Sequence, residues 1–547
     1  MKYLLSLLCW FFILTNCCAQ SLDSIYTRAM TAYNQHDYKT ASVEFSAIIK
    51  QQGYQLSSSK LYDGACIFAL NGEYTRSMDI LSFLAKERYY ANIGHLTSDS
   101  DLKNLHELPE WKILISRVKQ NQETLPARTK QNVKVALLKA KALLMQDNGK
   151  LWGENLWSDN LLVLGNDHTI YSLKILPGSV TADSVIYTKK IADNVLSQTN
   201  SSQKYDNQPY AVILTNYLSD SSVTIIHELF HVLQYKHINL NGNPVNYLDE
   251  YQARQRLRLE YQALKNALQA VRDKKEKALI RQYVTDALMY RKLRQQIDPQ
   301  SLDAELQIET SEGLANYTGF VLSSNTDKYL LAINEIDMRE SAPTYTRAFP
   351  YATGPAYGLL FDYLQMNWKT GLGKVYNFQA IYENDYLHHP INISPAAISK
   401  ADSRNNFATI NRQEVARKRD FDKKISYYTD LFEHYPTLSV LMTDSIYSRS
   451  YDMNGTVVLK DKGLVYSNIV GTDITGRNFG SFKMEADSVK KGLSGIFGDF
   501  ESHKFIFPLP VKIDGNKITG NGFHIQLNRG WVVRKKDKNG NLEIVQQ

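Results

Sequence analysis

The amino-acid sequence predicts an α+β, multidomain protein with helical repeats at the N-terminus, a centre of helices plus a small sheet, and a C-terminal antiparallel β domain. Its 547 residues exceed what one hydrophobic core usually serves. Helical periodicity runs from about 24 to 122 and returns after Ser222, whereas short strands between Gly, Asn and Asp turns fill the chain after Asp444. These changes of pattern divide the chain into three regions.

The composition is that of an ordinary folded protein. Hydrophobic residues make up 43% and charged residues 22% of the chain, so a packed core is expected rather than disorder. The formal net charge of +7 is spread along the chain, and no run of Lys and Arg interleaves with aromatic residues. Nucleic acid is therefore not an expected partner.

The first 20 residues have the pattern of a secretory signal peptide. Lys2 precedes an apolar run from Tyr3 to Leu14, and small and polar residues follow through Ala19 and Gln20. We therefore expect an exported protein, whether periplasmic, cell-surface or extracellular. No later apolar run is long enough to predict a transmembrane helix in the mature chain.

The cysteines fit this interpretation. Cys9, Cys17 and Cys18 lie in or beside the leader, so Cys66 is alone in the mature chain and no disulfide framework is predicted. The pair Cys17 and Cys18 also permits lipid anchoring, which stays open as an alternative to release.

Residues 21–125 are helical and repeat themselves. The segments "AYNQHDYKTASVEFSAII" and "CIFALNGEYTRSMDILSFL" align at a spacing of about 36 residues, with Ala41 matching Ser77. They resemble tetratricopeptide repeats, whose small residues let paired helices approach closely, and Leu105 and Trp111 look like a cap. Such repeats imply either a docking surface for a protein partner or a purely structural helical layer.

Residues 129–440 are predicted to form the central domain. Strand patterns such as "NLLVLGNDHTIYSLKIL" and "YAVILTNYL" occupy 129–218, and helices follow from Ser222. Within this region a highly charged segment, about 248–300, is predicted to form a helical hairpin with one apolar seam. Its charges are predicted to form a solvated face. Residues 444–547 are predicted to form a small β barrel or sandwich.

The stretch "VTIIHELFHVLQYKH" contains the residues best suited to bind a metal ion. On a helix His227 and His231 lie one turn apart on the same face, so their imidazoles can reach one cation, and Glu228 sits beside them. This is the HExxH arrangement of zinc hydrolases, in which the glutamate takes a proton from water. The flanking residues are apolar and lack proline, as a helix buried against a sheet requires, so two uncompensated histidines would be costly there.

Two residues compete to be the third ligand. His237 lies six residues after His231, but Gln234 stands where a sharp turn would need glycine. A continuing helix carries His237 about 120° away from the histidine pair. We therefore prefer a carboxylate from elsewhere in the chain.

That carboxylate comes from "ETSEGLANYTGF", which resembles the second motif of gluzincin metallopeptidases, the thermolysin and aminopeptidase N-like superfamily. The resemblance implies a zincin-like fold and a Zn²⁺ held by His227, His231 and Glu312. It also implies that Gly313 and Ala315 let the two metal-binding helices pack closely. Glu309, one turn before Glu312, shares its face and is a supporting or substitute ligand.

A third segment, "RAFPYATGPAYGLLFDYL", is similar to the Tyr-x-x-Gly segment of the aminopeptidase-like branch. By that resemblance Tyr351, followed by Gly354, donates a hydrogen bond to the oxyanion of the reaction, with Tyr357 as the alternative. An amphipathic core helix would explain the same aromatic residues.

The sequence thus predicts an exported zinc metallopeptidase that hydrolyses peptides or proteins, with Glu228 and Tyr351 as catalytic residues. The alternative is a non-catalytic binding or assembly protein that keeps a peptidase-like scaffold.

Overall fold

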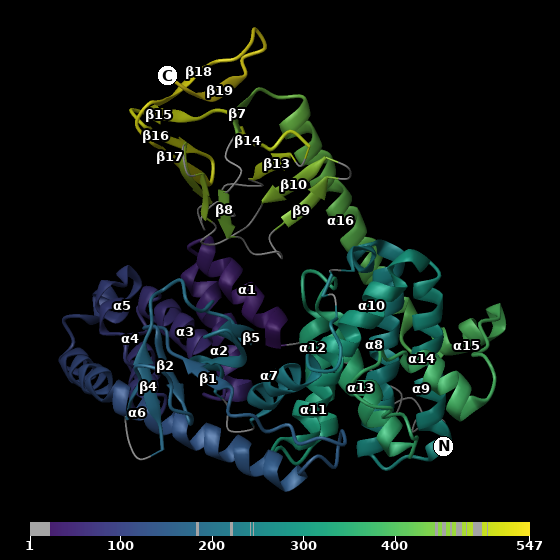
Figure 1. Ribbon diagram of the computed structural model, residues 1–547. Helices are drawn as coiled ribbons and strands as arrows, with labels where there is room; N and C mark the ends of the chain where they lie inside the picture. Colours follow the sequence, from purple (N-terminus) through teal and green to yellow (C-terminus); the bar gives the residue numbers. More distant parts are fainter. Residues whose placement is uncertain are drawn as a thin grey trace, which may run out of the picture. The chain divides into compact units, whose positions relative to one another are not determined.

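The computed structural model (Figure 1) divides the chain into two compact units, Met1–Asn132 and Val133–Gln547. The described residues are 22–181, 185–218, 222–240, 242–243, 245–442, 447–450, 456–459, 462–466, 473–476, 479–484, 495–499 and 501–547. The predicted signal peptide and the pair Cys17 and Cys18 lie outside them. The predicted α+β class is confirmed, with N-terminal helices, a helical middle with a small sheet, and C-terminal β sheets.

The first unit consists of antiparallel helices packed in sequence order. They are α1 (Leu22–Asn34), α2 (Tyr38–Gln52), α3 (Ser58–Leu70), α4 (Tyr74–Glu87), α5 (Ile93–Ser98), η1 (Ser100–Leu105) and the start of α6 (Pro109–Asp147). The two aligned segments contain most of α2 and α4, which occupy equivalent positions in the alignment. The matched residues Ala41 and Ser77 are both buried. Ser77 Oγ donates to the carbonyl of Ala65 at 2.7 Å, so a small polar side chain fits between α3 and α4. Leu105 and Trp111 close the same core.

Helix α6 runs through the boundary predicted between 125 and 129. Pro126 lies inside it, and the strands predicted from Thr129 begin only at Leu161. The helix continues past Pro126 because the residues beyond it recur at helical spacing and are buried, and their packing outweighs the cost of one proline: Val133, Leu137, Ala140 and Leu144.

A six-stranded sheet supports the centre of the second unit. Its strands are β1 (Leu161–Leu164), β2 (Thr169–Ser172), β3 (Val180–Thr181), β4 (Tyr187–Lys190), β5 (Ser201–Tyr205) and β6 (Gln208–Leu214), in the order β3-β4-β2-β1-β6-β5. Among these strands only the neighbours β1 and β6 pair in parallel. Ala211 and Ile213 of β6 face the main helical core, whereas Tyr210 and Val212 face a separate cluster, so both faces are covered.

The sheet is followed in the chain by a series of helices. After η2 (Thr215–Tyr217), they are α7 (Val223–Gln234), η3 (Asn246–Asp249), α8 (Tyr251–Arg272), α9 (Lys277–Gln295), η4 (Pro299–Ser301), α10 (Leu302–Ile308), η5 (Glu309–Gly313), α11 (Leu314–Leu322), α12 (Lys328–Glu340), α13 (Phe349–Tyr363), α14 (Phe378–Ile381), η6 (Tyr382–Leu387), α15 (Pro395–Arg404) and α16 (Phe407–Glu433). Helix α7 packs on β6 and on α11, and α11 packs on α13. No helix within the described ranges is long and apolar enough to cross a membrane.

The predicted hairpin in 248–300 is present as α8 and α9, which lie side by side (Figure 1). The prediction that its charges form a solvated face is wrong for part of it. Glu260 of α8 and Arg291 and Arg294 of α9 are fully buried. They form ion pairs with one another and with carboxylates of the following helices, as buried charged groups generally do.

The C-terminal region is a sandwich of two sheets. One has the order β18-β19-β7-β14-β13-β10-β9 and the other β15-β16-β17-β12-β11-β8. Their strands are β7 (Thr437–Leu441), β8 (Tyr447–Ser450), β9 (Thr456–Leu459), β10 (Gly463–Tyr466), β11 (Asp473–Gly476), β12 (Gly480–Met484), β13 (Ile496–Asp499), β14 (Lys504–Pro508), β15 (Lys512–Asp514), β16 (Lys517–Gly520), β17 (Phe523–Leu527), β18 (Trp531–Lys535) and β19 (Leu542–Gln546). Phe505 of the first sheet and Phe482 of the second meet at 5.0 Å between ring centroids. Strand β7 belongs to this sandwich although the sequence placed residues up to 440 in the central domain.

Candidate metal centre

Helix α7 presents both histidines from one face. His227 and His231 are four residues apart, and their Nε2 atoms lie 3.2 Å from each other. The apolar residues around them, including Ile226, Leu229 and Phe230, are buried in the main core. This packing fixes the helix against the sheet, so the two imidazoles project together at a defined position.

The third donor is Glu312, which lies in the π-helical segment η5. Its Oε2 atom lies 3.4 Å from Nε2 of His227 and 3.4 Å from Nε2 of His231. Ligand atoms about 2.0–2.1 Å from a tetrahedral zinc ion are about 3.3 Å from one another. The three donor atoms therefore form one face of a tetrahedron of the right size for zinc, and these residues form a group that could hold a metal.

The electrostatics of His231 and Glu312 also favour a cation between them. Burial lowers the pKa of His231, but the Glu312 carboxylate outweighs it and holds the pKa above its usual value. Burial raises the pKa of Glu312, yet His231 and His227 bring it well below the usual range. Three electron-pair donors that converge on one point need a positive charge between them, either a proton or a metal ion.

Glu228 lies beside this group with an unsatisfied oxygen. The residue is buried, and its Oε2 atom has no hydrogen-bond partner within the part of the chain described. Burial raises the pKa of Glu228, and the neighbouring histidines partly oppose that shift. A buried carboxylate oxygen without a partner is costly, and a bound water in the cavity would satisfy it.

Tyr351, on α13, lies across from the histidines. Its ring is nearly parallel to that of His227, at 5.9 Å between centroids. Burial and a hydrogen bond to Glu312 raise its pKa, so the phenol stays protonated and remains a donor. The predicted alternative, Tyr357, is fully buried and donates to Glu260 at 2.9 Å, and it is therefore a core residue.

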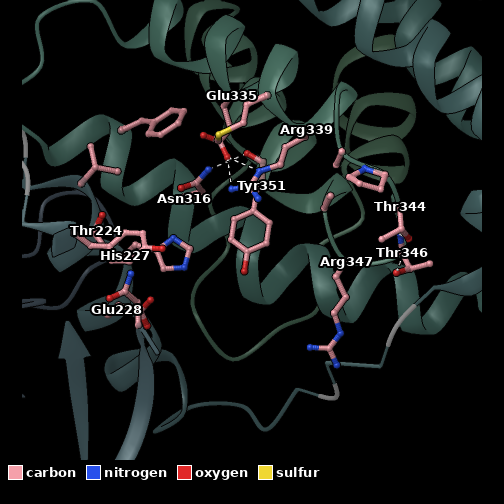
Figure 2. A pocket seen from close by; sticks show the side chains of 18 residues that line it. Thr224, His227, Glu228, Asn316, Glu335, Arg339, Thr344, Thr346, Arg347 and Tyr351 are labelled. Carbon is pink, nitrogen blue, oxygen red and sulfur yellow. Dashed lines mark hydrogen bonds and ion pairs between the residues drawn. The ribbon is translucent and has the colours of Figure 1, made fainter. Parts of the chain in front are cut away.

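These side chains border a cavity of about 640 Å³. Figure 2 shows His227, Glu228 and Tyr351 facing it, with Arg347 at a distance along its wall. The volume is within the roughly 300–1,000 Å³ typical of ligand sites. The candidate metal group therefore has a space in which a substrate can reach it.

The two other residues considered as ligands, His237 and Glu309, lie elsewhere. Helix α7 ends at Gln234 rather than continuing, and Nε2 of His237 pairs with Glu154 at 2.9 Å. Glu309 is fully buried and receives two bonds from Arg291, at 2.6 and 2.7 Å. It is not a substitute ligand, because both of its oxygens are already held by a cation.

Gly313 packs differently from what the resemblance implied. Gly313 contacts α13 rather than α7, since a Cβ on Gly354 would stand 2.2 Å from Gly313 Cα. The close approach to α7 comes instead from Gly319, where a Cβ would lie 2.9 Å from the carbonyl oxygen of Val223. The glycines thus bring the helices that carry Glu312 and Tyr351 into backbone contact.

Three residues of the site were not predicted. Asn316 donates to the backbone carbonyl of Tyr351 at 2.9 Å, and its position four residues after Glu312 could have indicated it. The guanidinium of Arg339 lies 4.3 Å from the centre of the Tyr351 ring and is held by Glu335 at 2.6 Å. Both lie on α12, and no sequence signal links that helix to the site.

A second group of possible metal ligands lies in the first unit and has a simpler explanation. Cys66, Asp99 and Asp101 cluster there. Tyr62 donates to Asp99 at 3.1 Å, and Tyr33 donates to Asp101. Burial raises the pKa of the Cys66 thiol, so it stays protonated and its role is structural.

Comparisons with known proteins identify no relative, so the case for a metal site rests on the geometry of its residues. Protein-family models, curated proteins and solved structures were all searched, and none matches this chain. What stands is a possible metal site of His227, His231 and Glu312 in an α+β protein.

Proposed function

We propose that the protein is an exported zinc-dependent metallopeptidase. The observation that carries this proposal is the convergence of Nε2 of His227, Nε2 of His231 and Oε2 of Glu312 within 3.2 to 3.4 Å of one another. His227, His231 and Glu312 would hold a zinc ion with three protein ligands, the number found in catalytic rather than structural zinc sites. The export rests on the leader-like residues 1–20, and the N-terminal sequence of the secreted protein tests it.

Zinc bound there would act as a Lewis acid and lower the pKa of a water molecule towards neutrality. Glu228 would take a proton from a water molecule held beside it while the oxygen of that water adds to the peptide carbonyl carbon. Tyr351 donates a hydrogen bond to the carbonyl oxygen as it gains negative charge. Glu228 then passes the proton to the amine as the carbon–nitrogen bond breaks.

The placement of these groups supports this assignment of roles. Glu228 is adjacent in sequence to one ligand, and its Oε2 atom has no other hydrogen-bond partner in the described structure. Tyr351 borders the cavity, and Asn316 and Arg339 hold it from two sides. Peptides are the proposed substrates because the histidine-glutamate pattern and the "SEGLANY" segment resemble those of gluzincin peptidases.

The test combines a metal measurement with hydrolysis of a peptide library. Wild-type protein should contain about one zinc per chain and cleave peptides, and Glu228→Gln should keep the zinc and lose cleavage by about 10²- to 10⁴-fold. Zinc without any cleavage by the wild type would favour the non-catalytic scaffold. Cleavage that survives Glu228→Gln would rule out the proposed mechanism.

A further inference from the structure

The segment that carries Glu312 is held by a buried ionic network. Segment η5 is a π-helix, a widened turn that is uncommon and concentrates at functional sites. Glu309 begins this segment, three residues before Glu312. A widened turn needs outside contacts to fix its conformation, and the side chain of Glu309 makes several.

Arg291 of α9 forms a bidentate ion pair with Glu309 through both terminal nitrogens. Nη1 donates to Oε2 at 2.7 Å and Nη2 to Oε1 at 2.6 Å, while Nε donates to Glu260 at 2.8 Å. All three side chains are fully buried. A bidentate pair of this kind fixes the orientation of a carboxylate as well as its position.

The carboxylate of Glu309 also contacts α13, the helix that carries the proposed catalytic residue Tyr351. Thr353 of α13 donates its hydroxyl to Oε1 of Glu309. Thr353 is two residues after Tyr351 and directly precedes Gly354, which touches Gly313. Arg291, Glu309 and Thr353 therefore join the hairpin, the metal-ligand segment and the tyrosine helix at one point.

Stability alone does not account for this network. Buried ion pairs are often no more stabilising than well-packed apolar residues, because desolvation offsets the attraction between the charges. Their better-supported use is to specify one arrangement of elements. Here the arrangement specified is the rotation of the π-helical turn that points Glu312 at the two histidines.

We propose that Arg291 is a positioning residue for the metal centre, acting through Glu309 on Glu312. The inference rests on the proposed metal function of Glu312. It assigns a role to the charged hairpin, since Arg291 reaches the metal-ligand segment from α9. Partners that orient a metal ligand typically contribute 10- to 100-fold in affinity.

Arg294 provides a matched control. It lies one turn from Arg291 on α9, is equally buried, and also pairs with Glu260, at 3.1 Å. Its other partners are Glu305 of α10, at 2.6 Å, and Tyr247, at 3.0 Å. It does not touch Glu309, so its loss disturbs the network without releasing η5.

The experiment measures zinc affinity by competition with a chelating dye, on full-length protein whose fold is checked by circular dichroism. Arg291→Met should weaken zinc binding by about 10- to 100-fold, and Arg294→Met by less than about 3-fold. Arg291→Lys, which keeps the charge but not the two parallel bonds, should fall between wild type and Arg291→Met. Unchanged affinity in folded Arg291→Met, or equal losses in both methionine variants, would overturn the proposal.

If Arg291→Met does not fold, Thr353→Val decides the matter. It removes one hydroxyl donor to Glu309, keeps the side-chain volume and leaves every charge in place. A zinc affinity about 3- to 10-fold weaker supports the positioning role, and wild-type affinity refutes it. These readouts do not depend on hydrolysis, so wild-type protein that binds zinc but cleaves nothing would contradict the peptidase function and leave this inference standing.

Discussion

The ring of Tyr351 lies almost parallel to that of His227, with 8° between their planes. This relationship places the phenol of α13 beside α7, the helix that carries the proposed ligands His227 and His231. Tyr351→Phe removes the hydroxyl and keeps the ring. We expect kcat to fall by about 10- to 1,000-fold, since a donor to the developing oxyanion is lost, with zinc content unchanged.

Tyr357→Phe is the control for this change. That hydroxyl donates to Glu260 in the core, so its loss should lower the melting temperature and leave kcat near the wild-type value. Steady-state kinetics on both variants separates the two tyrosines. Equal losses of kcat would contradict the assignment of Tyr351 as the oxyanion donor.

Glu312→Gln should weaken zinc binding by more than the 10- to 100-fold typical of an outer partner, because a charged ligand becomes neutral. His237→Ala should bind zinc as the wild type does, since His237 pairs with Glu154 instead. Zinc per chain after dialysis measures both. Retention of zinc by Glu312→Gln together with its loss from His237→Ala would show that the histidine, and not the carboxylate, is the third ligand.

Zinc binding should release protons at neutral pH. In the metal-free protein the pKa of His231 is above its usual value, so part of the protein carries a proton that must leave before Nε2 can bind zinc. Affinity should therefore rise with pH through and above the usual histidine range of about 6.5, and level off once His231 is deprotonated. Calorimetric titration in buffers of different ionisation enthalpy counts the protons, and a count of zero would contradict the shift.

Gly354→Ala should destabilise the protein by about 1–3 kcal/mol, because its new methyl group would stand 2.2 Å from Gly313 Cα, where only backbone can move. The separation it forces should also weaken zinc binding, since Gly313 adjoins Glu312. Gly373→Ala is the control, because its nearest neighbour lies at 3.8 Å and its φ is unstrained. Urea unfolding and zinc titration measure both variants, and equal stability of the two would mean that the helices are not in contact.

The protein should lose stability in acid partly through Glu340. Burial raises its pKa, but Lys265 at 2.8 Å and Arg258 at 3.0 Å outweigh burial and lower it below 4.5. Its contribution is therefore complete above the usual glutamate pKa and disappears as pH falls through the lowered value.

Lys265→Met tests this contribution. The variant should be roughly 1–2 kcal/mol less stable than the wild type at pH 7, and the difference should shrink as the pH falls below the usual glutamate pKa. Urea unfolding at several pH values measures it. A difference that does not depend on pH would mean that the lysine acts by packing alone.

The sequence predicted those parts of the site that depend on local periodicity or on a motif. His227 and His231 follow from helical spacing, because residues four apart share a face. Glu312 is 81 residues beyond His231, so spacing alone could not identify it, and the resemblance of "ETSEGLANY" to a known motif did. Arg339 remained hidden because its helix carries no motif and meets Tyr351 only through tertiary packing.

Buried charges were the hardest feature to predict. Arg291 and Arg294 look like surface residues, since a lone arginine is rarely buried. Their partners Glu305 and Glu309 lie on other helices, and nothing in a single sequence shows which charges will meet. For a similar reason the sequence does not show that α6 continues past Pro126, because the packing of Val133 and Leu137 outweighs the local effect of one proline.

The position of β7 limits how the chain can be dissected. This strand lies between β14 and β19, so the sheet is completed by residues 542–546 at the opposite end of the region. A recombinant fragment that stops at 440 would carry a strand with both edges unpaired, and the remaining fragment would have a gap in its sheet. Such truncations should aggregate, so substitutions in the intact chain are the sounder way to assign roles.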